Sequence, residues 1–275
     1  MRLESVAAFS ALVKQVKADH PKVSTNCYLM PNDIADFCLQ NRMQYVLLDA
    51  GVYFLCDMGN FYRVYYYLDP EIGLGAIQPA DKPMAIEFVA ANGRIRPQDE
   101  TIEENWAKAG FVLNTKSLRL QRITGALPYA VPEGFSIRIA KAEDGDAVYA
   151  LWFATFDPVR NLLPSREALS ASIEKGEVLC AFAADGQLAG VLQAEFGRGI
   201  GITWHIAVDE ACRGKGLYWP MLHAYYALAK EKGIEKHHMW VEENNTRVLD
   251  TVTRHGYAYD GIQSRQYVLG SKDFL

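Results

Sequence analysis

One stretch in the second half of the chain constrains the fold more than any other. It runs from Ile202 to Pro220 and reads as a strand, a glycine-containing loop at Arg213-Gly214-Lys215-Gly216, and the beginning of a helix. Proline has no N–H group, so it is tolerated in a helix only in the first turn. A helix that begins near Gly216 puts Pro220 in that turn. This arrangement predicts unpaired backbone amides at about residues 214–218.

Unpaired amides at the positive end of a helix suit a pyrophosphate group. Gly214 and Gly216 leave the backbone open to a ligand, and Arg213 and Lys215 add positive charge. A tight exposed turn is the alternative for an isolated Gly-x-Gly, but the preceding strand and the following helix favour the phosphate site. A Walker A string is absent from the sequence, and Gly197–Gly201 precedes a strand, which predicts a hairpin turn.

The rest of the second half alternates short strands and helices. Asp185-Gly186 predicts a hairpin, and Asp144 and Ser165 are expected to cap helices. The expected strands are 136–140, 178–184, 188–196, 202–208, 236–242 and a pair over 257–269; the expected helices are 144–156, 165–175, 217–232 and 246–255. This order predicts an α/β (α+β) fold with a mixed, mostly antiparallel sheet and flanking helices.

The first half has a similar mixture. Residues 123–134 hold two prolines and two glycines, which predicts a linker and two domains, 1–125 and 135–275. The first domain is expected to contain helices at 3–18, 32–40 and 100–109, a meander at 45–48, 52–56 and 61–68, a strand at 85–90 and a strand pair from Phe111.

A short internal echo links the two halves. Gly110-Phe111 followed by Arg119 recurs 146 positions later as Gly256-Tyr257 followed by Arg265. A duplicated unit and chance recurrence both remain open at this point.

Composition excludes several classes of protein. The chain has 275 residues, a net charge of −5 and no Lys/Arg-rich block, so no nucleic-acid partner is expected. Its apolar runs are shorter than a membrane span, and no membrane partner is expected. The five cysteines form no C-x-x-C pair, and His237-His238 would point to opposite faces of a strand, so neither disulfides nor a metal site is expected. These features favour a cytoplasmic protein.

The loop and its surroundings resemble the GNAT superfamily of N-acetyltransferases over residues 135–269. The family signature is Arg/Gln-x-x-Gly-x-Gly/Ala; Arg213 and Gly216 fit its first two positions, whereas Tyr218 replaces the small third residue. The first half has no Arg-Gly-x-Gly loop. It is expected to be a degenerate GNAT-like domain without a coenzyme A (CoA) site.

The resemblance implies a sheet with a splayed strand pair that holds the pantetheine arm of acetyl-CoA. It implies that backbone groups of Ile206 and Val208 pair with pantetheine and that the amides of residues 214–218 hold the pyrophosphate. The cofactor-binding residues that it implies are Ile206, Val208, Arg213, Gly214, Lys215, Gly216, Leu217, Tyr218 and Asn245. Val252 falls where many members carry a tyrosine that protonates the departing thiolate.

Three residues are candidates for proton transfer. His205 is a candidate because a histidine ordinarily has a pKa near neutrality, Glu242 because it ends the strand beside the expected splay, and Tyr257 because it begins the last strand. Each has a structural alternative: a core histidine, a solvated strand-end charge and a core aromatic residue.

These features predict an N-acyltransferase that moves an acetyl (acyl) group from acetyl-CoA to a small-molecule or peptide amine. We expect direct transfer in a ternary complex, because no cysteine or serine stands in an evident nucleophile setting. A non-catalytic CoA-binding or regulatory protein is the alternative, motivated by Val252. A homodimer is left open.

Overall fold

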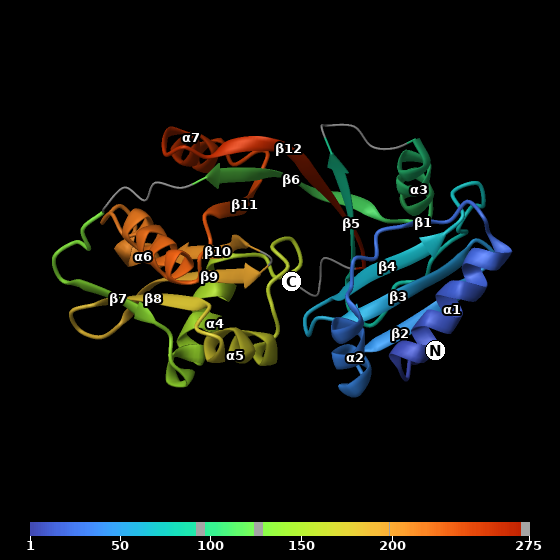
Figure 1. Ribbon diagram of the computed structural model, residues 1–275, viewed down its shortest axis with the longest axis horizontal. Helices are drawn as coiled ribbons and strands as arrows, with labels where there is room; N and C mark the ends of the chain where they lie inside the picture. The colour runs from blue at the N-terminus through green and yellow to red at the C-terminus, as the bar shows by residue number, and fades with distance from the viewer. Residues whose placement is uncertain (92–96, 124–128, 198, 271–275) are drawn as a thin grey trace. The chain divides into compact units, whose positions relative to one another are not determined.

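The structure is a computed structural model that describes residues 1–91, 97–123, 129–197 and 199–270 (Figure 1). The chain divides into two compact units, one made of Met1–Ser117 with Gly261–Leu275 and the other of Leu118–Asp260. It passes from the first unit to the second within strand β6 (Val112–Ile123) and returns within β12 (Ala258–Leu269). The linker predicted at 123–134 follows the first crossing, and its residues 124–128 lie outside the described part.

The first unit is built on a sheet with the strand order β2-β3-β4-β5-β12. Strands β2, β3 and β4 form the predicted antiparallel meander, β4 and β5 are parallel, and β12 pairs antiparallel with β5. The elements are α1 (Val6–Asp19), β1 (Ser24–Thr25), α2 (Pro31–Leu39), β2 (Met43–Leu48), β3 (Gly51–Asp57), β4 (Tyr62–Leu68), β5 (Met84–Ala91) and α3 (Pro97–Lys108).

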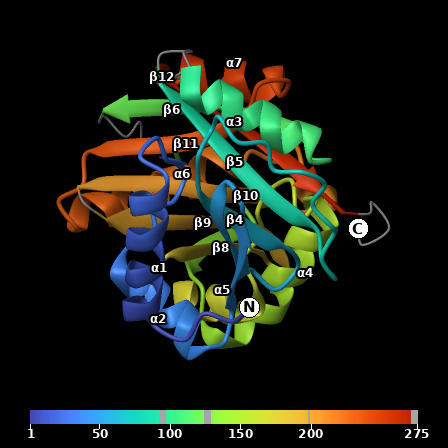
Figure 2. The ribbon, with the colours of Figure 1, turned by 90° about the vertical axis from the view of Figure 1, so that its right-hand side faces the viewer.

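Both faces of this sheet are covered, which explains why β3 and β4 are apolar at nearly every position. Helices α1 and α2 pack on one face, where Phe9 and Ile34 meet alternate residues of β3 such as Phe54. Helix α3 packs on the other face, where Trp106 is completely buried among Tyr53 and its neighbours. Figure 2 shows the same elements from the side.

The second unit has the strand order β6-β11-β10-β9-β8-β7. Helices α4 and α5 pack on one face of this sheet, and α6 and α7 pack on the other. The elements are β7 (Phe135–Ile139), α4 (Gly145–Thr155), α5 (Arg166–Glu174), β8 (Val178–Ala183), β9 (Leu188–Gly197), β10 (Ile200–Val208), α6 (Tyr218–Glu231), β11 (Lys236–Glu242) and α7 (Thr246–Arg254). The predicted α+β class is confirmed in both units. Within the described residues, no helix is long and apolar enough to cross a membrane.

The predicted strand pairs from Phe111 and over 257–269 are wrong, because each region is one twelve-residue strand. Asp260-Gly261 is a typical turn dipeptide, yet here Asp260 forms an ion pair with Arg119 at 2.8 Å and the chain continues in the strand.

The expected helix caps differ in outcome. Ser165 caps α5 as predicted, accepting a hydrogen bond from the amide of Ala168. Asp144 occupies the N-cap position of α4 as predicted, but its side chain makes no capping hydrogen bond to that helix. The Asp144 carboxylate instead accepts hydrogen bonds from the Lys141 amide and the Arg138 guanidinium.

The internal echo extends to structure. In both halves a helix is followed by a glycine with positive φ, a buried aromatic residue and a twelve-residue strand. The glycines are Gly110 (φ 107°) and Gly256 (φ 85°), and the aromatic residues are Phe111 and Tyr257, 2% and 1% exposed. A shared local geometry of this kind favours a duplicated unit over chance.

Candidate functional site

The parallel strands β10 and β11 pair along only part of their length. Their pairing ends at Thr203 and Met239, although β10 continues to Val208 and β11 to Glu242. The other edge of β10 stays paired with β9 as far as Val208. The edge of β10 that faces β11 therefore opens beyond Thr203, and we call this opening the β10–β11 splay (residues 204–208 and 240–242). Such an opening leaves backbone donors and acceptors for a ligand.

A β-bulge at the narrow end of the splay sets which side chains face which helices. The register of β10 against β9 shifts between Thr203 and His205. Before the bulge, Gly201 faces Tyr225 of α6. After it, His205 and Ala207 face α4 instead. The bulge therefore puts Gly201 and His205 on opposite faces of the sheet, although strict alternation would place both residues on one face.

The loop after β10 leads into α6 as expected. Gly214 and Gly216 have φ values of 79° and 80°, a backbone region that favours glycine. A side-chain carbon at Gly214 would have no neighbour within 4 Å, and at Gly216 only a Pro132 carbon at 3.8 Å. These glycines are thus required by the turn and leave the backbone open.

Helix α6 begins at Tyr218, so Pro220 lies in its first turn, as predicted. The amide of Met221 makes the first helical bond, to the carbonyl of Leu217 at 3.1 Å. Among the described residues, none accepts a hydrogen bond from the backbone amides of residues 216–219, and the side chain of Leu217 does not cap the helix. These amides point to a site for an anionic group.

Charged side chains of the loop lie close to this helix end. Lys215 places its ammonium group 5.9 Å from the ring centre of Phe135. Arg213 turns back, and its Nε donates to the carbonyl oxygen of Val208 at 3.3 Å. That carbonyl therefore already has one donor and keeps a second lone pair for a ligand.

The remaining predicted binding residues have other contacts. Tyr218 is largely enclosed by protein, and burial raises the pKa of its phenol. The side-chain oxygen of Asn245 caps α7 by accepting from the amide of Val248 at 3.3 Å. Asn245 thus contributes to the helix that follows β11, and its role in binding stays a prediction.

Glu242 lies at the open end of β11 and is held by an arginine. Nε of Arg160 donates to one carboxylate oxygen at 2.8 Å, and Nη2 donates to the other at 2.5 Å. The pair raises the pKa of Arg160. Both oxygens of Glu242 therefore have a donor, and Arg160 must move before a substrate amine can approach them.

His205 is buried and both ring nitrogens have neighbours. Nε2 donates to the carbonyl of Asn161 at 2.8 Å, and Nδ1 lies 2.8 Å from the side-chain amide of Gln193. Burial lowers the pKa of His205 to about 4. These contacts favour the structural alternative, a core histidine.

Tyr257 is 1% exposed, and its hydroxyl lies 2.7 Å from that of Tyr226. Burial raises its pKa well above the ordinary value. Val252 is completely buried in the same core. Neither residue faces solvent, so Tyr257 also fits its structural alternative.

Sequence reasoning missed the α4–α5 loop (residues 156–165), which supplies Arg160 and Asn161. Asp157 accepts hydrogen bonds from the amides of Val159 and Arg160, and Leu162 has a φ of 52°. The Asp157-Pro158 dipeptide signals a turn, but nothing local in the sequence shows that the loop reaches β11.

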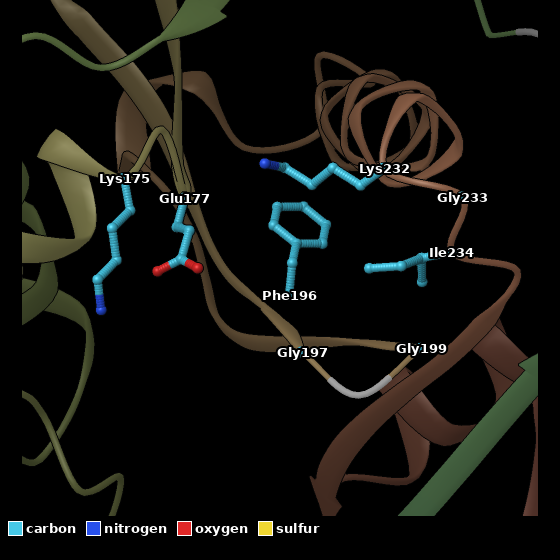
Figure 3. Close-up of a pocket in the computed structure, with 8 residues that line it drawn as sticks. All are labelled: Lys175, Glu177, Phe196, Gly197, Gly199, Lys232, Gly233 and Ile234. Atoms are coloured by element: carbon cyan, nitrogen blue, oxygen red, sulfur yellow. The ribbon is translucent and has the colours of Figure 1, made fainter. Parts of the chain in front are cut away.

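A separate open hollow of about 480 Å³ lies at the other end of β10 (Figure 3). It is lined by the β9–β10 hairpin and the end of α6, including Phe196 and Lys232. The Lys232 ammonium lies 5.4 Å from the Phe196 ring centre. The hollow shares no lining residue with the loop at 213–219.

Comparisons with known proteins agree with this geometry. Residues 145–257 match the model of the Acetyltransferase (GNAT) family. No curated protein sequence matches the chain.

Several solved structures share the fold. A tandem GNAT protein from the clavulanic acid biosynthesis pathway has a TM-score of 0.54 at 14% identity, covering 98% of this chain and 94% of that one. A GNAT-family acetyltransferase from Colwellia psychrerythraea has 0.53 at 14%, covering 98% and 99%. A GCN5-related N-acetyltransferase from Sphaerobacter thermophilus has 0.54 at 16%, covering 88% and 78%.

Proposed function

We propose that this protein, whose residues 145–257 form a GNAT-family acetyltransferase domain, transfers an acyl group from acetyl-CoA to an amine. The observation that carries the proposal is that two features occur together at one end of β10. A splay opens between β10 and β11, and the loop after β10 leads to a helix start with unpaired amides.

The two features match two neighbouring parts of a CoA molecule, the pyrophosphate and the pantetheine arm. The amides of residues 216–219 and the charge of Lys215 suit the pyrophosphate. The open edge of β10 at Ile206 and Val208 suits the amide groups of the pantetheine arm, which would carry the thioester into the splay.

Direct transfer requires a neutral amine at the thioester carbonyl. Two of the three candidates, His205 and Glu242, belong to the splay residues, and of these Glu242 is the one that can be freed by a movement of one side chain, Arg160. His205 and Tyr257 are enclosed by protein. We therefore propose Glu242 as the group that receives the proton of the amine, with the thiolate taking a proton from solvent.

A second candidate is a protein that binds CoA without catalysis. The buried Val252 and the paired Glu242 favour it, since no described side chain at the splay is ready to act as an acid. Calorimetry with acetyl-CoA followed by thiol-release assays over a panel of amines separates the two. Release of free thiol with any amine supports transfer. Binding without release supports the second candidate, and no binding contradicts both.

A further inference from the structure

The first unit contains a second splay of the same kind. Strands β4 and β5 are parallel, and their pairing ends at Val64 and Ile86. The other edge of β4 remains paired with β3 as far as Leu68. Residues 65–68 of β4 and 87–91 of β5 therefore form a β4–β5 splay that corresponds to the β10–β11 splay.

The loops that follow the two splays also begin alike. The carboxylate of Asp69 accepts from the amide two residues ahead at 2.9 Å, and the carboxylate of Asp209 does the same at 2.9 Å. The backbone amides of Asp69 and Asp209 donate to the carbonyls of Ala50 and Ala189. These matching contacts align the end of β4 with the end of β10.

The β4–β5 splay is filled by the chain itself. The segment Ser24–Asn26 enters it, and β1 pairs antiparallel with β4 on the edge that faces β5. The carboxamide of Asn26 accepts from the amide of Tyr66 at 2.9 Å. It also donates to the carbonyls of Val64 at 3.0 Å and Glu87 at 3.3 Å, one on each strand.

The segment is held firmly in place. Ser24 is 1% exposed and its hydroxyl donates to Asp99 at 2.8 Å, while the hydroxyl of Thr25 donates to the carbonyl of Tyr66 at 2.6 Å. Removing the segment would leave buried backbone groups of β4 without partners, which is destabilising.

The loop after β4 also lacks the helix that follows β10. Within the described residues, 71–83 form neither helix nor strand. Leu74 and Ile77 are buried against the sheet there, in the core that contains Trp106. The first unit therefore has no helix start to receive a pyrophosphate after its splay.

We infer that the segment Ser24–Asn26 fills the β4–β5 splay, an opening that formerly received a ligand, and so acts as its internal occupant. The chain therefore binds one CoA molecule rather than two. The Asn26 carboxamide presents to β4 the same donor and acceptor that an amide of pantetheine would present to β10. This inference rests on the proposed function of the β10–β11 splay.

The test is calorimetric titration of the full chain with CoA, using two matched variants. Gly216→Glu and Gly75→Glu each place a carboxylate at a positive-φ glycine in the loop after a splay, at φ 80° and 67°. Neither position has a protein atom closer than 3.8 Å to the added carbon. One CoA per chain is expected, with binding lost in Gly216→Glu and unchanged in Gly75→Glu. Two CoA per chain, or binding lost only in Gly75→Glu, overturns the inference.

Hydrogen exchange separates this inference from the proposed function. The amide of Tyr66 should exchange slowly without CoA, because it donates to Asn26, and should be unchanged by CoA. Replacing Asn26 with alanine should raise its exchange rate at least tenfold. Fast exchange of Tyr66 in the unmodified chain contradicts the internal occupant. A slow Tyr66 with no CoA bound anywhere confirms the occupant and contradicts the proposed function.

Discussion

Arg160 binds both carboxylate oxygens of Glu242, at 2.8 and 2.5 Å, across the open end of the β10–β11 splay. The next residue, Asn161, accepts a hydrogen bond from His205 on the opposite strand. Two consecutive residues of the α4–α5 loop are therefore tied to the two arms of the splay. This arrangement links the loop to the width of the opening and to the charge of Glu242.

Replacing Arg160 should affect transfer more than CoA binding. We expect Arg160→Met to lower stability by only about 1 kcal/mol, since the pair is partly solvated. Amine turnover should rise about threefold, because Glu242 then accepts the proton without a prior movement of Arg160, while the Kd for CoA changes less than threefold. Arg166→Met is the matched control, because Arg166 pairs with Asp146 on the exposed surface. A lower turnover in Arg160→Met, or an equal rise in both variants, would contradict this role of Arg160.

Glu242→Gln tests the proposed proton acceptor. The carboxamide keeps the shape of the side chain but accepts no proton at neutral pH. Turnover should fall at least a hundredfold, with little change in the Kd for CoA, as measured by thiol release and calorimetry. Tyr257→Phe should retain most turnover, because that hydroxyl lies in the core against the hydroxyl of Tyr226. The opposite ranking of the two variants would assign the proton transfer to Tyr257.

Lys215 should contribute to CoA binding through its charge. Reversing it in Lys215→Glu is expected to weaken CoA binding about tenfold at low salt and less at high salt, since exposed charges are screened. Lys232→Glu is the control, because Lys232 lies at the other end of α6. Calorimetry at two salt concentrations measures both. Equal weakening would place the phosphates elsewhere.

Acid should destabilise the second unit through two buried histidines. Burial lowers the pKa of His205 and of His237 from 6.5 to about 4. Between these pH values the unfolded chain binds protons that the folded chain does not, so the free energy of unfolding falls as pH falls from about 6.5 towards 4. Each histidine can contribute on the order of 3 kcal/mol over that range.

Urea unfolding at pH 7.5 and pH 5 measures this effect. His205→Gln and His237→Gln should each show a smaller loss of stability between the two pH values than the unmodified chain. An identical loss in all three proteins would show that other groups carry the pH dependence.

Replacing either of the repeated glycines, the one after α3 or the one after α7, should lower the stability of the protein by a similar amount. Gly110→Ala and Gly256→Ala each force a side chain into a positive-φ backbone, which costs about 1–2 kcal/mol. Gly145→Ala is the control, because Gly145 begins α4 with ordinary helical geometry and room for a methyl group. Thermal unfolding should show lower Tm values for the first two variants only. An equally low Tm for Gly145→Ala would exclude the backbone explanation.

Local patterns were sufficient to predict most elements. The positions of β11 and of the helix that begins beside Pro220 follow from alternation and from proline chemistry, and both are confirmed. The glycine loop could also be predicted from local sequence, since the strand before it, the turn and the helix after it are adjacent in the chain. The strand pair predicted over 257–269 is wrong because the chain continues through Asp260-Gly261 as one strand that is shared by two units.

Long-range contacts could not be predicted from local sequence. Arg160 and Glu242 are 82 positions apart, and Asn26 and Tyr66 are 40 apart. No rule of sequence spacing predicts either pair, because each contact depends on which strands become neighbours in the sheet. A core position for His205 is one of the alternatives that the sequence allows. The identity of its two hydrogen-bond partners cannot be predicted from local sequence, because they come from different elements.

The most direct test of the proposed site is backbone hydrogen exchange with and without acetyl-CoA. Acetyl-CoA should slow exchange of the amides at residues 216–219 and along residues 204–208, and should leave exchange in β4 unchanged. Protection at β4 alone, or protection at neither segment while acetyl-CoA is bound, would contradict the proposed CoA site.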